Sequence, residues 1–204
     1  MTAGAINTAG YLLEVAGSGT GILSGVVSGS GGLALSGSRL ELSGSNTYSG
    51  GTWVHFGRLV VDGSITASSG VTVNAGGSLG GSGLVAALGG SGSIDPGGSP
   101  GILTAPSLDP TAGLGFNFEF TQVGPPTWGN PAASGNDVLR LQNITTPFTA
   151  ALSSANAHFR MSGFWHADCF LKIRRTSTPQ CCVESVARTA GDDTLGPFTL
   201  HTLL

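Results

Sequence analysis

Residues 40–79 read LELSGSNTYSGGTWVHFGRLVVDGSITASSGVTVNAGGSL, and this stretch decides the fold class. Short runs rich in apolar and β-branched residues alternate in it with clusters of Ser, Gly and Asn. The runs are residues 40–42, 52–56, 59–61 and 71–73. Such runs are too short for the helices of a globular domain, but they have the length and composition of β-strands. The stretch therefore predicts stacked short strands that are joined by tight corners.

Composition extends this interpretation to the rest of the chain. Among 204 residues there are 35 Gly, and only 9% of the residues are charged. Disordered chains are rich in charge and poor in aliphatic residues, whereas here Leu, Ile and Val recur between the glycines in numbers that can line a core. Glycine in bulk suits a fold made of corners, because it accepts backbone conformations that a Cβ atom disfavours.

Two internal repeats favour a solenoid. The segment LALSGS at 33–38 is nearly copied at 40–45, and a Gly-x-Leu/Ile unit recurs at irregular spacing. We predict an all-β fold, a right-handed parallel β-helix (solenoid), with about 20 residues in each coil and about seven coils. An antiparallel sandwich is the alternative. It would prefer longer alternating strands and two-residue hairpins, for which Asp62-Gly63 is the only signal.

A family resemblance supports the solenoid. Residues 43–52 (SGSNTYSGGT) and 57–61 (GRLVV) resemble the autotransporter-associated β-strand repeat of bacterial surface proteins, and the similarity continues through 69–83 and 95–103. The positions that match its motif, all of them structural, are Ser43, Gly44, Asn46, Thr47, Tyr48, Ser49, Gly50, Gly51, Thr52, Gly57, Leu59, Val61, Gly76, Gly77, Leu79, Pro96, Gly97, Ser99, Pro100 and Gly101.

The resemblance implies a function as well as a fold. It implies a non-catalytic β-helix stalk segment of an autotransporter-like passenger, secreted or exposed at the outer-membrane surface of a bacterium. Its partners would be neighbouring coils and a C-terminal translocating β-barrel that this sequence does not contain. The alternatives are an adhesin module that binds a host protein or glycan, and a polysaccharide lyase or hydrolase. Because residues 1–6 lack the features of a secretory signal, we expect a fragment or a misplaced start.

The character of the chain changes near residue 157. Only 3 of the 35 glycines follow this point, whereas 5 of the 8 Lys and Arg residues and all three cysteines do. We predict a repeat region at 1–141, a segment that ends the solenoid at 142–157 and an irregular tail at 158–204. Our hypothesis is that the tail is out of frame or foreign to the fold, and the alternative is an ordinary divergent C-terminal domain.

Several classes of function are disfavoured by the sequence. A net charge of −3 with a single lysine, Lys172, argues against nucleic-acid binding, which needs clustered basic residues. No apolar segment approaches the roughly 20 residues of a transmembrane helix. The glycine runs at 17–21 and 29–32 lack the helix that a phosphate-binding loop requires. We therefore expect no cofactor, no nucleic-acid partner and no transmembrane helix.

Candidate catalytic and metal-binding residues also lack the partner residues that such sites require. Ser99 has no matching base and acid, and a calcium site at 89–95 would place its Asp one position late without a tandem copy. His166 and the cysteines are spaced too loosely for a zinc site. The carboxylates that a polysaccharide-cleaving site would need are scattered singly along the chain, as Asp62, Asp95, Asp109, Glu119 and Asp137. We predict no enzymatic activity and no metal.

Trp53 and His55 are the candidate surface contacts. The family usually has small polar residues at these two positions. Strand alternation places both on one face, opposite Val54 and Phe56, and so predicts an exposed aromatic ledge that can stack on a sugar or a partner. The competing interpretation, which we favour, is that these aromatic residues are packing substitutions.

Overall fold

The computed structural model describes residues 2–97, 101–119 and 137–142, together with the strand backbones at 158–162, 170–175 and 181–186. The strands are β1 (Thr2–Ala3), β2 (Ile6–Asn7), β3 (Leu13–Leu23), β4 (Val27–Ser28), β5 (Leu33–Leu42), β6 (Thr52–Val61), β7 (Val71–Val73), β8 (Gly77–Gly81), β9 (Leu88–Gly90), β10 (Ser93–Pro96), β11 (Ile102–Ala105), β12 (Gly115–Glu119), β13 (Val138–Leu141), β14 (His158–Ser162), β15 (Phe170–Arg175) and β16 (Cys181–Val186).

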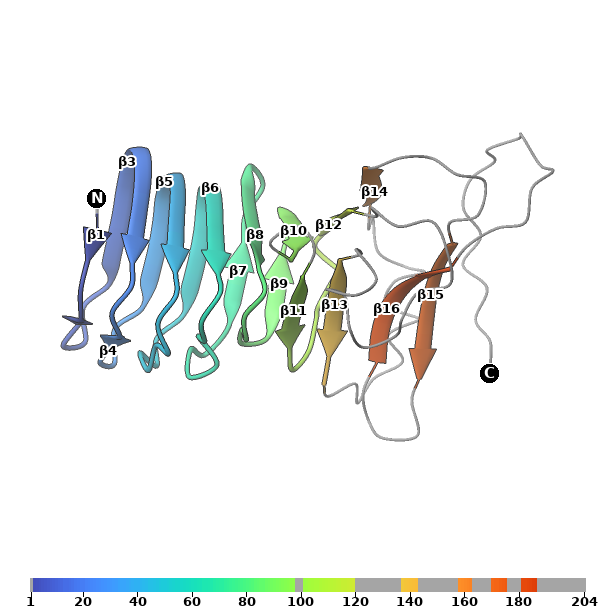
Figure 1. Cartoon of the computed structure of the whole chain (residues 1–204). Helices are drawn as coiled ribbons and strands as arrows, with labels where there is room; N and C mark the ends of the chain where they lie inside the picture. The colour runs from blue at the N-terminus through green and yellow to red at the C-terminus, as the bar shows by residue number, and fades with distance from the viewer. Residues whose placement is uncertain are drawn as a thin grey trace.

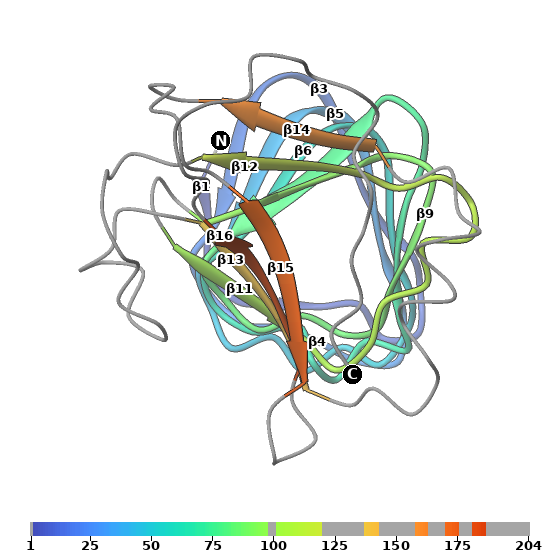
Figure 2. The same ribbon diagram turned by 90° about the vertical axis from the view of Figure 1, so that its right-hand side faces the viewer.

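The strands stack coil upon coil along one axis, as a right-handed parallel β-solenoid of about six turns (Figures 1 and 2). On one face the stacked positions are Leu13, Leu33, Thr52, Val71, Leu88 and Leu108. The ladder pairings among β1 to β13 are all parallel. The solenoid prediction is therefore confirmed, with about six turns where about seven coils were expected, and the antiparallel sandwich is excluded.

Three faces enclose the core (Figure 2). The first halves of β3, β5 and β6 form one face, which continues into β7 and β9. Their second halves form the next face and continue into β8, β10 and β12. The third face begins with β2 and β4, runs through isolated bridges at Ser45, Ser64 and Leu84, and ends in β11 and β13.

Aliphatic side chains fill the interior as columns that run along the axis. Leu40, Leu59, Leu79, Ile94 and Phe116 occupy paired positions in successive coils, and none is more than 2% exposed. The inward residues on which the prediction depended are buried: Leu59, Val61, Val71 and Val73. Because one coil cannot bury its own apolar face, each coil depends on its neighbours for stability.

Coil length varies along the chain, which explains the irregular spacing of the repeats. The step is 19 residues from Leu33 to Thr52, 17 from Val71 to Leu88 and 22 from Ser93 to Gly115. Register shifts interrupt the ladders between Gly17 and Thr20 in β3 and between Leu35 and Arg39 in β5. In β6 the chain turns at Gly57, whose φ is +79°.

Three strands lie within the segment that the sequence predicts to be an irregular tail. β14 pairs in parallel with β12, while β16 pairs antiparallel with both β13 and β15. Of residues 142–157 the structure describes Gln142, whose backbone N–H donates to the carbonyl of Ala105 at 3.0 Å. The foreign origin of residues 158–204 stays a prediction.

Gly57→Ala should destabilise the solenoid strongly. The backbone there is left-handed, and an added Cβ would overlap the carbonyl oxygen of Gly37 in the preceding coil. We expect the free energy of unfolding to fall by about 2–4 kcal/mol in urea titrations. Gly19→Ala is the matched control, because a Cβ there meets nothing within 4 Å and its φ is not positive. Equal effects of the two substitutions would contradict the corner assignment.

Candidate functional site

The motif residue Asn46 acts inside the fold, as a clamp between three coils. Its side chain is 3% exposed, and its Oδ1 accepts from the backbone N–H of Val27 at 2.8 Å. Its Nδ2 donates to the carbonyls of Gly44 at 2.9 Å and Ser64 at 3.1 Å. The amide thus satisfies backbone groups in the coils on either side of its own.

Tyr48 and Thr52 belong to a second buried polar group. Tyr48 Oη lies 2.7 Å from Thr52 Oγ1, which in turn lies 3.0 Å from Ser68 Oγ. The Ser68 hydroxyl also lies within hydrogen-bond distance of the carbonyl oxygens of Gly50 and Gly70, at 2.9 and 3.1 Å. Burial raises the pKa of Tyr48 to about 12, although the hydrogen bond with Thr52 acts in the opposite direction.

The remaining motif residues hold the backbone of neighbouring coils together. The N–H of Thr47 donates to Val27 at 2.8 Å, and the N–H of Ser49 donates to Gly29 at 3.0 Å. Hydrogen bonds of the same kind involve Ser43, Gly44, Gly50, Gly51, Gly57 and Gly76, and Gly77 pairs with Gly57 in the ladder between β6 and β8. The backbone of these residues serves coil stacking, while the side chains of Ser43, Thr47 and Ser49 lie exposed on the outer surface.

The second part of the motif closes a later corner. Pro96 ends β10, Gly97 has a φ of +89°, and the N–H of Gly101 donates to the carboxylate of Asp137 at 3.2 Å. Ser99 and Pro100 lie outside the described residues. Asp137 is buried, and the only sign of this role in the sequence is its place directly before the apolar run of β13.

Trp53, His55 and Phe56 share the outer face of β6. Val54 is fully buried between them, whereas Trp53 is 37% and Phe56 64% exposed. The prediction that Phe56 lies on the face opposite Trp53 and His55 is wrong. Leu35 pairs with Val54 but Ser36 pairs with Phe56, so His55 is an extra residue in a β-bulge and the alternation is reset after it.

Both aromatic rings lie over glycines. Cζ3 of Trp53 lies 2.8 Å from the position that a Cβ on Gly32 would take, and its Cη2 and Cζ2 lie 2.7 Å from the corresponding position at Gly51. Cδ1 of Phe56 lies 3.3 Å from that position at Gly76. The indole therefore leans over the preceding coil, and the phenyl ring leans over the following one.

His55 is held by the next coil. Nδ2 of Asn74 lies 2.8 Å from Nδ1 of His55. Because an amide NH₂ group can only donate, Nδ1 of the imidazole is the acceptor in this pair and the ring N–H lies on Nε2. The half-buried pair of His55 and Asn74 thus places an imidazole N–H and an amide oxygen beside the two aromatic residues.

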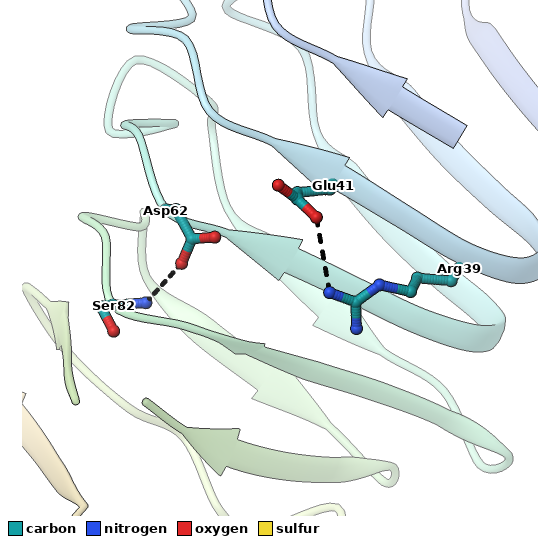
Figure 3. Close-up of polar contacts among 4 residues, drawn as sticks. All are labelled: Arg39, Glu41, Asp62 and Ser82. Atoms are coloured by element: carbon teal, nitrogen blue, oxygen red, sulfur yellow. Dashed lines mark hydrogen bonds and ion pairs between the residues drawn. The ribbon is translucent and has the colours of Figure 1, made fainter. Parts of the chain in front are cut away.

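The carboxylates are engaged separately. Asp95 receives Arg58 Nη1 at 2.6 Å and Asn117 Nδ2 at 2.6 Å, and the Arg58 side chain reaches it across Gly80, where a Cβ would lie 2.6 Å from Nη2. Asp62 accepts from the N–H of Ser82 at 3.0 Å, near the ion pair of Arg39 with Glu41 at 3.4 Å (Figure 3).

Asp109 is also bound locally, because hydrogen bonds from the hydroxyl and backbone N–H of Thr111 lower its pKa. The side chain of Glu119 lies outside the described residues, as do those of His166, Cys169, Cys181 and Cys182. Within the described ranges, no group of three or more His, Cys, Asp or Glu side chains is arranged to hold a metal ion. The same ranges contain no helix that is long and apolar enough to cross a bilayer.

Comparison of the chain with protein-family models gave no match, and comparison with curated proteins gave none either.

Asn46→Ala should lower the free energy of unfolding by about 2–3 kcal/mol, because it leaves the buried N–H of Val27 without its partner and removes the side-chain hydrogen bonds to Gly44 and Ser64. Asn7→Ala is the control. Asn7 is exposed, and its Oδ1 accepts a single local hydrogen bond from Ala9 at 2.9 Å. We expect a change below about 1 kcal/mol for the control in urea titrations. A similarly small effect at Asn46 would refute the clamp.

The raised pKa of Tyr48 predicts a loss of stability at high pH. Its neutral form is favoured in the folded state, so the stabilisation is complete below pH 10 and is lost as the pH rises from 10 towards 12. The loss amounts to about 2–3 kcal/mol. Tyr48→Phe should be about 1 kcal/mol less stable than wild type at pH 8, and this gap should close and reverse above pH 10. A difference in the free energy of unfolding between Tyr48→Phe and wild type that stays constant in urea titrations from pH 8 to 11.5 would contradict the raised pKa of Tyr48.

Proposed function

We propose that the chain is a structural stalk segment of a bacterial surface-exposed or secreted autotransporter-like passenger, without catalytic activity. The observation that carries the proposal is that the motif side chains at Asn46, Tyr48 and Thr52 are buried, and that Asn46 and Thr52 hydrogen-bond to neighbouring coils. The sequence resemblance at 43–52 supports the passenger assignment. A chain whose distinctive residues serve stacking is suited to a mechanical role.

The geometry supports such a role in a simple way. Backbone hydrogen bonds run along the axis from one coil to the next, so each coil supports its neighbour and adds about 4.8 Å of reach. The pairing of Arg58 with Asp95 reinforces the outside, since it connects β6 to β10 across the intervening β8. The number of repeats therefore determines the length of the rod, and this role requires no reactive site.

Removal of one whole coil tests the stalk. Deletion of residues 71–87 joins Gly70 to Leu88, which already occupies the position stacked on Val71. We expect the shortened protein to fold cooperatively, to lose about 4.8 Å of length, and to label as well as wild type when antibodies are added to intact cells that make it. Circular dichroism and immunolabelling are the measurements.

Deletion of residues 71–78 is the control, because it removes part of a coil, breaks the register and should prevent folding. Two results would contradict the proposal. One is labelling of the wild type only after the cells are permeabilised. The other is a folded one-coil deletion that no longer reaches the surface.

A further inference from the structure

We infer that the outer face of β6 at Trp53, His55 and Phe56, with Asn74 beside it, is a binding site for a neutral oligosaccharide. This aromatic ledge goes beyond the stalk function, because stacking of the coils does not require it. The bulge at His55 turns Phe56 outward, to 64% exposure, where regular alternation would have buried it. Bulges commonly re-aim side chains beside functional sites.

The indole of Trp53 is preorganised for stacking by its contacts with the protein. One side of its six-membered ring lies against the backbones of Gly32 and Gly51, and the residue is still 37% exposed. A ring held in place before binding loses little conformational freedom when a ligand stacks on it. A pyranose ring offers a patch of C–H groups on one face, which suits stacking on an aromatic surface.

Polar groups lie beside the rings, as recognition of hydroxyl groups requires. The hydrogen bond from Asn74 fixes the imidazole of His55 with its proton on Nε2. This arrangement leaves one donor, the imidazole Nε2–H, and one acceptor, Oδ1 of Asn74. Sugar hydroxyls both donate and accept, so they match this pair.

The surroundings favour a ligand without charge. The outward neighbours of Trp53 in the adjacent coils are Ala34 and Thr72, which are neutral. The guanidinium of Arg58, the charged group nearest in sequence, is paired with Asp95 at 2.6 Å. A sulfated or acidic glycan would find no free cation in this part of the described surface.

The spacing indicates the size of the ligand. Trp53 and Phe56 are three residues apart on an extended strand, or about 10 Å along the backbone. One sugar ring covers about half of that span, so a monosaccharide reaches a single aromatic ring. We therefore expect affinity to rise from the monosaccharide to the trisaccharide.

A panel of neutral oligosaccharides tests the ledge with the whole chain of 204 residues. Immobilised β-1,4-glucan, β-1,3-glucan, α-1,4-glucan and β-1,4-mannan tetrasaccharides, with their monosaccharides, are the probes. We expect binding to at least one tetrasaccharide and an affinity reduced about tenfold by Phe56→Ala, with an unchanged melting temperature. Tyr11→Ala is the matched control, because Tyr11 is 79% exposed and lies in the first coil.

Three outcomes would overturn the inference. The first is that no tetrasaccharide binds at concentrations up to about 5 mM. The second is that Phe56→Ala and Tyr11→Ala have equal effects. The third is that Phe56→Ala weakens binding of apolar peptides while neutral glycans are not bound, which would assign the ledge to a protein partner.

Discussion

Backbone hydrogen bonding along the solenoid axis is the constraint on which the rest of the structure depends. It sets each coil about 4.8 Å from the next and forces side chains at equivalent positions to stack. Leu40 therefore lies under Leu59, and Leu59 under Leu79, as a continuous apolar column. Because the stacking is strictly local, stability is distributed along the axis and has no single centre.

The same constraint explains the polar residues and the glycines. A corner interrupts the backbone ladder, so a group left without a partner there must be satisfied by a side chain, as Asn46 does for the N–H of Val27. Where two corners come close together, even a methyl group is too large, as at Gly57. The motif residues are therefore those that join one coil to the next.

The outer surface is under no such restriction, and there the chain can acquire other properties without disturbing the core. Two features of β6 illustrate this. The Arg58 side chain uses the space left by Gly80 to reach Asp95 two coils away in the stack. The bulge at His55 exposes Phe56 without moving Val54 from the core. A rigid rod with a small aromatic surface is a coherent combination, because the stacked coils hold that surface still.

The sequence by itself determined the fold class, because strands this short, separated by glycine-rich corners, can bury their apolar residues only by stacking. It also identified the inward residues from Leu59 to Val73, since alternation within a strand is a local property. It could not reveal the partners of Asp95 or Asp137, which lie 37 and 36 residues away from them in the chain. Only the tertiary structure decided those pairings and the outward turn of Phe56. Coil length varies, so the register between coils, and the bulges that adjust it, depend on contacts that no fixed period in the sequence encodes.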